Sequence, residues 1–233
     1  MPPHCPSFRL ALSEDSMKNL TVLFDLDGTL TDPGEGITNS VAYALRHYGI
    51  EIEDRSTLYP FIGPPLTESF MKYFAFSEEQ AKEAVEIYRE YFSVKGLFEN
   101  TPYDGISAML STLQEQGATL IVASSKPEIY VRQILQHFDL LRYFRFAAGS
   151  ELNHKRIDKH EVIEYALNTC GINDRSRCIM VGDRHHDVHG AKKSGIPVIG
   201  VTYGYGSKEE LTEAGADHVV HTVEDLTKLL QEI

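Results

Sequence analysis

Short apolar runs and longer amphipathic stretches alternate along most of this chain. Six apolar runs have the length of buried strands, and they occupy residues 22–24, 120–123, 146–148, 179–181, 198–201 and 218–220. Helix-length segments, for example 106–116 and 159–170, separate most of these runs. Strands and helices that alternate in this way form a parallel sheet with helices on both faces. The pattern therefore predicts an α/β fold with a Rossmann-like parallel sheet as its core.

A stretch with a different pattern, residues 33–101, follows the first predicted strand. Apolar residues recur there at helical spacing, and Gly49 and Gly96 are placed to end two of the helices. A capping box at Ser77 to Gln80 opens another helix. We predict that residues 33–101 form a small all-helical insert.

The remaining residues then form two units. Residues 17–32 and 102–233 make up the predicted α/β core, which the insert interrupts after its first strand. Residues 1–16 contain neither a basic segment nor a long apolar segment and do not resemble a secretory signal. We expect them to be a mobile N-terminal extension or the product of an upstream start codon chosen in error.

Two carboxylates end the first apolar run, in the sequence VLFDLDGTLT of residues 22–31. Asp25 and Asp27 are two residues apart, which on a strand directs both side chains to one face. Carboxylates this close repel each other unless a cation or a shared proton relieves them. The pair suits a nucleophile beside a general acid/base, with a divalent metal between them. An ordinary Asp-Gly turn explains this segment alone equally well, so the other strand ends decide between the two interpretations.

Polar side chains also follow two other predicted strands. Ser124 directly follows the run 120–123 and precedes a predicted helix. Its hydroxyl either forms an anion site with the free N–H groups of the helix N-terminus or is a simple N-cap. Asp183 and Asp187 follow the run 179–181. Because the carboxyl ends of parallel strands share one edge, four carboxylates would gather there and require a cation. Oxygen ligands favour Mg²⁺, and the sequence predicts a magnesium site.

Basic residues precede the predicted helix 159–170. Lys155 and Lys159 both lie near its N-terminus, where the helix dipole disfavours positive charge unless an anion is present. One of the two is therefore a candidate for binding a substrate anion, and a solvated basic loop is the alternative. Lys159 is preferred because residues 158–161 have the pattern of a helix start.

Three histidines, His185, His186 and His189, lie close to the candidate carboxylates. No cysteine pattern accompanies them, and the nearby carboxylates suit a harder cation than zinc. We expect them to be exposed residues at a helix start.

Composition limits the classes of partner. The 233 residues are 42% hydrophobic and carry a formal net charge of −12, which argues against binding to nucleic acid or to an anionic membrane surface. No apolar run reaches the length of a membrane span. Three cysteines without a close pair, Cys5, Cys170 and Cys178, indicate reduced thiols and a cytoplasmic protein. The last two lie in apolar stretches and are predicted core residues.

Four separated segments resemble, in order and spacing, the motifs of the haloacid dehalogenase-like hydrolases, in particular the phosphoglycolate-phosphatase-like members with a helical cap. Residues 25–29, DLDGT, match the first motif, and Ser124 matches the second. Lys159 best matches the third, and residues 182–187 match the fourth, G-D-x-x-x-D. The resemblance extends from about Thr21 to the C-terminus.

This resemblance implies a phosphatase that hydrolyses small phosphate monoesters through an aspartyl-phosphate. Asp25 would attack phosphorus, and Asp27 would protonate the leaving oxygen and later activate water. Ser124, Lys159 and Thr29 would bind the transferring phosphoryl group.

The resemblance also implies the ligands of Mg²⁺. These would be Asp25, the backbone carbonyl of Asp27, and Asp183, with Asp187 on the metal or on its water shell.

The family places a cap where this chain has residues 33–101. Such a cap closes over the site, excludes water and selects the leaving group. Residues 61–66 resemble the cap loop that faces the active site, with Gly63, Pro64 and Leu66 as candidate specificity residues. A lid over a small cleft favours small phosphorylated metabolites as substrates. We expect the protein to be a monomer or a homodimer.

Several functions share these motifs. The leading hypothesis is a phosphoglycolate-phosphatase-like enzyme, and a 5′-nucleotidase acting on nucleoside monophosphates is the first alternative. A sugar phosphomutase resembling β-phosphoglucomutase has all four motifs as well. A phospho-accepting regulatory module would not need Asp27, and a dehalogenase would need neither Mg²⁺ nor a second aspartate.

Overall fold

The computed structural model describes residues 18–153 and 155–233, so the predicted extension 1–16 and Cys5 lie outside the described part. A parallel sheet of six strands forms the centre of the larger unit, in the order β5-β4-β1-β6-β7-β8. All six predicted strands are present, as β1 (Thr21–Phe24), β4 (Thr119–Pro127), β5 (Phe146–Ser150), β6 (Cys178–Gly182), β7 (Val198–Val201) and β8 (His218–Val220). The predicted α/β fold is confirmed.

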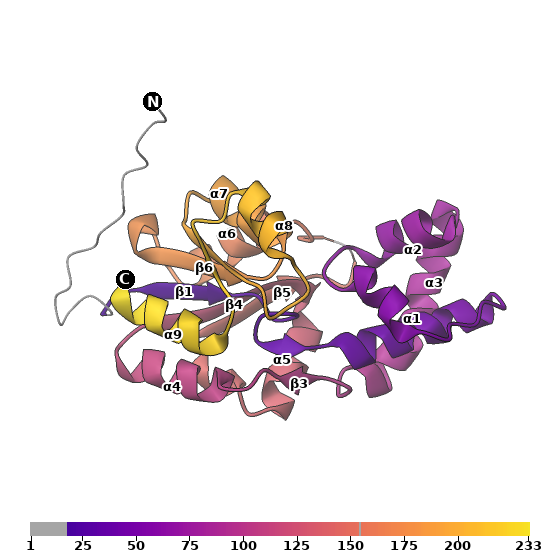
Figure 1. Ribbon diagram of the computed structural model, residues 1–233, viewed down its shortest axis with the longest axis horizontal. Helices are drawn as coiled ribbons and strands as arrows, with labels where there is room; N and C mark the ends of the chain where they lie inside the picture. The colour runs from indigo at the N-terminus through magenta and orange to yellow at the C-terminus, as the bar shows by residue number, and fades with distance from the viewer. Residues whose placement is uncertain (1–17, 154) are drawn as a thin grey trace.

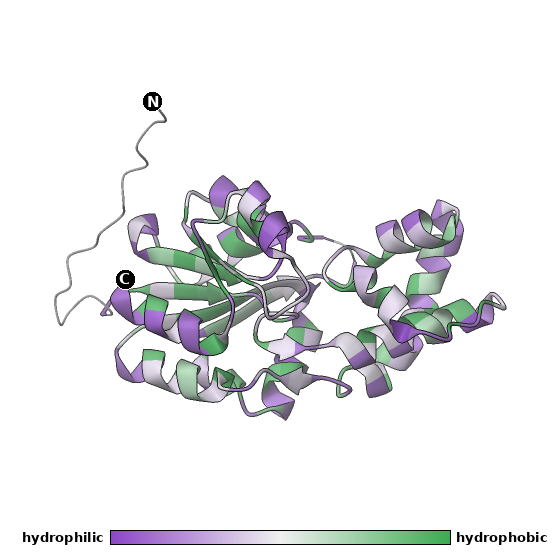
Figure 2. Ribbon diagram, viewed as in Figure 1, coloured by the Kyte–Doolittle hydropathy of each residue, from purple (hydrophilic) through white to green (hydrophobic). Residues whose placement is uncertain are grey.

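Alternate residues of each strand face opposite sides of the sheet, and each side has its own hydrophobic core. Val22 and Phe24 of β1 face one core, whereas Leu23 faces the other. The first core is covered by α4 (Ile106–Glu115), α5 (Glu128–His137) and α9 (Val223–Glu232), and the second by α6 (Lys159–Thr169), α7 (His185–Lys193) and α8 (Lys208–Ala214). Figure 2 shows the hydrophobic residues concentrated along the strands. Cys170 and Cys178 are buried in the second core, as predicted.

Residues 33–100 are largely helical and lie beyond the end of the sheet, whereas Thr101 belongs to strand β3 (Thr101–Pro102) (Figure 1). They form α1 (Gly34–His47), a 3-10 helix η1 (Arg55–Phe61), α2 (Leu66–Phe74), α3 (Glu78–Tyr91) and a short π-helix η2 (Phe92–Gly96). The capping box of Ser77 and Gln80 is present at the start of α3.

Two features at the junction of the insert and the sheet were not predicted. A two-stranded antiparallel ladder of β2 (Thr31–Asp32) and β3 (Thr101–Pro102) joins the two ends of the insert. Strand β4 continues past residue 123 with an irregular register.

Short 3-10 turns η3 (Leu141–Tyr143) and η4 (Arg175–Arg177) complete the chain. No helix in the described part of the chain has the length and apolar character that crossing a bilayer requires.

Candidate active site

Three carboxylates meet at the carboxyl edge of the two central strands. Asp25 directly follows β1, Asp183 directly follows β6, and Asp187 lies in the first turn of α7. Carboxylate oxygens of the three residues lie within 4.8 Å of one another, and all three residues are buried. The register that pairs Phe24 with Val181 brings the ends of the two strands side by side. The structure thus gathers these predicted residues at one point.

Glycines permit this close approach. Gly28 has a φ of +78°, and a Cβ at its position would lie 2.1 Å from Asp183 Oδ2. A Cβ at Gly182 would lie 2.2 Å from Asp187 Cγ. Both positions therefore require glycine if the carboxylates are to keep their places.

Lys159 lies between two of the carboxylates. Its Nζ is 2.9 Å from Asp25 Oδ1 and 2.8 Å from Asp187 Oδ1, and it donates to the Ala123 carbonyl at 3.1 Å. Burial alone would lower the pKa of Lys159, but the charges of Asp187 and Asp25 raise it above its ordinary value. The ammonium group therefore stays charged. Lys155, the competing candidate, is exposed.

The carboxylate cluster has the chemistry of a hard divalent cation site. Asp183 Oδ1 is buried and has no hydrogen-bond partner among the described residues. Burial raises the pKa of Asp183 well above its usual range, and the charges of Asp187 and Asp25 raise it further. Burial likewise raises the pKa of Asp187 to about 6. One ammonium group does not neutralise three carboxylates, so an oxygen-only set of this kind fits Mg²⁺.

Asp27, expected as the fourth carboxylate of this cluster, lies outside it and has a cation of its own. Lys126 Nζ, on the extended end of β4, is 2.5 Å from Asp27 Oδ2, and both side chains are largely buried. Burial raises the pKa of Asp27, and Lys126 offsets only part of that rise. The ammonium of Lys126 also lies 4.8 Å from the ring centroid of Phe92, in the insert. Sequence reasoning missed Lys126, although its place two residues after Ser124 could have suggested it.

The two hydroxyl residues predicted to bind phosphate are both buried. Ser124 follows Ala123, whose carbonyl accepts from Lys159, and its Oγ accepts a hydrogen bond from the Lys126 N–H at 3.4 Å. Thr29 Oγ1 has no hydrogen-bond partner in the described part of the chain. Ser124 therefore lies close to the carboxylates and lysines.

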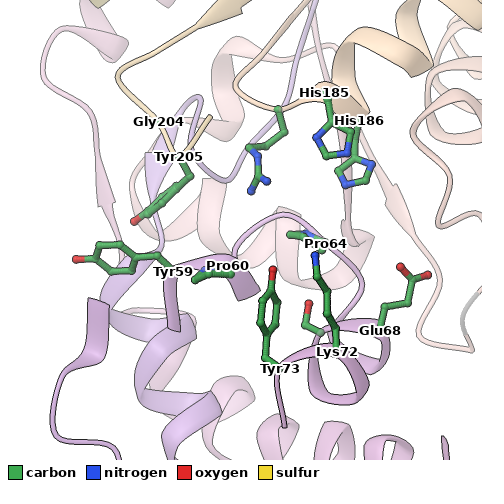
Figure 3. Close-up of a pocket in the computed structure, with 12 residues that line it drawn as sticks. Tyr59, Pro60, Pro64, Glu68, Lys72, Tyr73, His185, His186, Gly204 and Tyr205 are labelled. Atoms are coloured by element: carbon green, nitrogen blue, oxygen red, sulfur yellow. The ribbon is translucent and has the colours of Figure 1, made fainter. Parts of the chain in front are cut away.

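A cavity of about 740 Å³ lies between the insert and the sheet domain (Figure 3). Its lining comes from η1 and α2 of the insert and from the segments after β6 and β7, and consists of Tyr59, Pro60, Pro64, Glu68, Ser69, Lys72, Tyr73, Arg184, His185, His186, Gly204 and Tyr205. Figure 3 shows Lys72 and Tyr73 opposite His185 and His186. The cavity adjoins the carboxylates, because the Tyr205 N–H donates to Asp183 Oδ2 at 2.8 Å.

The candidate specificity loop contributes unevenly to this cavity. Pro64 lines it, and Gly63 lies against Arg184. Leu66 begins α2 and packs against the hydrophobic core, and Phe61 is buried among aromatic rings of the insert.

The expectation that all three histidines are exposed was wrong for two of them. His185 and His186 are half-buried and line the cavity, because α7 begins beside the insert, whereas His189 is exposed. In the described residues, the carboxylate cluster is the group that could hold a metal, and the histidines do not belong to it.

Comparison with known proteins identifies the family. The family model of the haloacid dehalogenase-like hydrolases matches residues 22–201. The chain belongs to this family. The resemblance seen in the four motifs is therefore confirmed, and with it the assignment as a phosphatase-type hydrolase.

Relatives of this haloacid dehalogenase-like hydrolase carry more specific names. A 5′-nucleotidase of Pseudomonas aeruginosa is 46% identical, over 94% of this chain and 98% of that protein. The tyrosine-protein kinase PtkA of Mycobacterium tuberculosis is 36% identical, over 90% of this chain and 72% of that protein. The crystal structure of a predicted phosphatase from Clostridium acetobutylicum superposes with a TM-score of 0.88 at 51% identity, covering 92% of this chain and 99% of that one.

Proposed function

We propose that this protein is a cytoplasmic, Mg²⁺-dependent phosphatase that hydrolyses small phosphate monoesters through an aspartyl-phosphate on Asp25. The observation that carries the proposal is the division of charge at the site. Asp25 belongs to a three-carboxylate cluster with Lys159, whereas Asp27 lies outside the cluster and pairs with Lys126. A nucleophile and an acid/base with separate partners fit a two-step transfer.

Asp25 is oriented for attack by contacts to one of its oxygens. Oδ1 accepts the Leu26 N–H at 2.7 Å and the Lys159 ammonium at 2.9 Å, which leaves Oδ2 to attack phosphorus. In the first step the bond from phosphorus to this oxygen forms and the bond to the leaving oxygen breaks. Lys159 and Ser124 would bind the phosphoryl oxygens, because both lie beside Asp25 at the strand edge.

Asp27 supplies and recovers the proton. Its raised pKa favours a protonated fraction that donates to the leaving oxygen in the first step. In the second step water attacks phosphorus, its proton passes to Asp27, and the bond between phosphorus and Asp25 breaks. Asp25, Asp183, Asp187 and the backbone carbonyl of Asp27 would hold Mg²⁺, which when bound offsets the negative charge of the phosphoryl group.

We further propose that residues 33–101 are the cap and that the cavity beneath them holds the leaving group. A volume of about 740 Å³ is within the range of small-molecule sites and far exceeds what glycolate would fill. Tyr59, Tyr73 and Tyr205 offer aromatic faces to a planar group. With the 46% identity to a 5′-nucleotidase, this supports a nucleoside 5′-monophosphate rather than phosphoglycolate as substrate.

The test is hydrolysis by the purified protein of a set of nucleoside 5′-monophosphates, phosphoglycolate and p-nitrophenyl phosphate, each with Mg²⁺ and with a chelator. We expect the highest kcat/KM for a nucleotide and loss of all activity in chelator. Full activity in chelator would refute the metal requirement. A preference for phosphoglycolate would refute the assignment of the cavity while leaving the phosphatase mechanism intact.

The covalent step needs a separate measurement. Rapid quench of Asp27→Asn with a ³²P-labelled nucleotide should trap phosphate on the protein, and the double variant that also carries Asp25→Asn should trap none. Equal labelling of both variants would contradict Asp25 as the nucleophile.

A further inference from the structure

Arg184 connects the insert to the carboxylate cluster. Its Nη1 donates to the Ile62 carbonyl of the insert at 2.7 Å, across 122 residues of sequence. Its backbone N–H donates to Asp187 Oδ2 at 3.1 Å, and it directly follows Asp183. One residue therefore contacts both the insert and a carboxylate of the proposed cation site.

The Arg184 side chain binds the sheet domain through its Nε and the insert through its Nη1. Its Nε donates to Glu210 Oε1 at 2.9 Å. The same carboxylate accepts from the backbone N–H of His185 at 3.0 Å and lies 2.6 Å from His185 Nδ1. Despite burial, these bonds lower the pKa of Glu210 to about 2, so it stays ionised. The position of the guanidinium is thus tied to the first turn of α7, where Asp187 lies.

The insert has a glycine at the point of contact. Gly63 has a φ of +102°, and a Cβ there would lie 3.3 Å from Arg184 Nη1. Ile62 is also held on its own side, because its N–H donates to the Tyr59 carbonyl at 2.9 Å. The accepting carbonyl and the donating guanidinium are both oriented by their own domains.

Tyr205 makes a second link of the same kind. Its ring packs edge-on against Tyr59 of the insert, with centroids 5.6 Å apart, and its hydroxyl contacts Asp32, the residue just before the insert. Its backbone N–H donates to Asp183 Oδ2 at 2.8 Å. Two insert contacts thus come from residues whose N–H groups bind the two carboxylates of the fourth motif.

We infer that Arg184 is a positioning residue that couples the position of the insert against the sheet domain, here called the closed position, to cation binding by Asp183 and Asp187. This inference rests on the proposed function, because it takes the carboxylate cluster to be a Mg²⁺ site. When the insert leaves the sheet domain, the bond to Ile62 breaks and the start of α7 loses that restraint. Linkage makes the effect reciprocal, so Mg²⁺ favours the closed insert to the same degree that closure favours Mg²⁺.

Two measurements without substrate test the coupling: calorimetric binding of Mg²⁺ alone, and amide hydrogen exchange of residues 55–74 with and without Mg²⁺. In the wild-type protein we expect Mg²⁺ to slow exchange in that segment. Arg184→Met should weaken Mg²⁺ binding about fivefold or more and abolish the slowing. Circular dichroism verifies that the variant is folded.

Gly63→Ala perturbs the same contact from the insert side, away from every carboxylate. Its added methyl group strains the loop and displaces Arg184, so we expect weaker Mg²⁺ binding here also. Arg89→Met is the matched control. Arg89 of α3 donates across to the Leu152 carbonyl at 3.4 Å, a similar arginine–carbonyl contact, and its ion pair with Glu86 lies outside the cluster of Asp25, Asp183 and Asp187. It should leave Mg²⁺ affinity unchanged.

The remaining outcomes would overturn the inference. Wild-type Mg²⁺ affinity in Arg184→Met would show that the contact carries no coupling. A loss in Arg184→Met without a loss in Gly63→Ala would show a local defect of α7. An equal loss in Arg89→Met would show general loosening of the insert. A wild-type protein that binds no Mg²⁺ would overturn both this inference and the proposed metal requirement. The first three outcomes would overturn the inference alone, so the two kinds of failure can be told apart.

Discussion

Replacing Lys159 with methionine removes the cation between two buried carboxylates and keeps the length of the side chain. In the wild-type protein the ammonium lies 2.9 Å from Asp25 Oδ1 and 2.8 Å from Asp187 Oδ1. Lys159→Met leaves both carboxylates buried without that partner. We therefore expect that, without metal, the variant is folded but much less stable than the wild-type protein.

Removing one partner of a buried ion pair costs about 3–5 kcal/mol, because the remaining charge has been desolvated without compensation. Lys159 is 5% exposed, so this range applies without a reduction for solvent screening. Its pKa in the folded protein lies above the ordinary value of 10.5. The stabilisation is therefore fully present below that value and is lost only as the pH rises through the higher folded pKa. For a chain of this size, the loss at neutral pH lowers Tm by about 6–20 °C.

The assay is thermal and urea unfolding at neutral pH, followed by circular dichroism, in chelator and in Mg²⁺. Mg²⁺ supplies positive charge to the same two carboxylates, so it should narrow the difference in stability between the variant and the wild-type protein. The kcat of the variant should fall by about 10²–10³, the usual effect of removing one group that stabilises the charge of the transition state.

Lys155→Met is the matched control, four residues earlier in the same segment and exposed. It should change stability by less than about 0.5 kcal/mol and leave kcat near the wild-type value. The reasoning would be refuted by a Lys159→Met protein as stable as the wild type in chelator. It would also be refuted by equal losses of kcat in the two variants, because then neither lysine would have a specific role at the site.

Three further predictions concern other parts of the site. Asp25→Asn should abolish turnover while the circular dichroism spectrum stays unchanged, because an amide cannot attack phosphorus; substantial residual activity would contradict the covalent mechanism. Lys72→Met should lower kcat/KM for the best nucleotide more than for p-nitrophenyl phosphate, because Lys72 reaches into the cavity (Figure 3). Equal losses of kcat/KM for the two substrates would count against the leaving-group site, as would a similar loss of kcat/KM in the control Lys82→Met, whose side chain is exposed. Burial, with the charges of His185 and Arg184, lowers the pKa of His186 to about 4, so between about pH 6.5 and 4 the unfolded chain binds a proton that the folded protein does not, and stability falls as the pH drops through this range. In urea unfolding, His186→Asn should lack about 1–2 kcal/mol of that decrease after allowance for partial exposure. A pH profile of stability identical to that of the wild-type protein would contradict a neutral His186.

The chemistry at the strand ends was largely predictable because it depends on local sequence and on one general rule. Each core strand is a short apolar run, and the residue after it is placed at the carboxyl edge by the parallel arrangement. Asp25, Asp183 and Asp187 therefore met as expected. The helical insert was predictable for a similar reason, since its apolar spacing and its capping box lie within single helices.

Other features depended on contacts between distant segments. Lys126 is 99 residues from Asp27 in sequence, and a lysine in a polar segment has no periodicity that indicates a partner. The ladder of β2 and β3 contains two residues in each strand, too few for an alternating pattern. The sequence thus indicated which groups the strand edge would contain, but not which cation would pair with each carboxylate.

The sequence by itself determined the fold class, most helices of residues 33–101 and three of the four carboxylates expected in the cluster, because periodicity and strand order act over short distances. Only the tertiary structure decided how the insert sits on the sheet domain. That arrangement brings Arg184 to Ile62 across 122 residues, packs Tyr205 against Tyr59, and forms the cavity between the two units. These contacts arise where two separately folded surfaces meet, and the free energy of that packing depends on shapes that no single segment of the chain encodes.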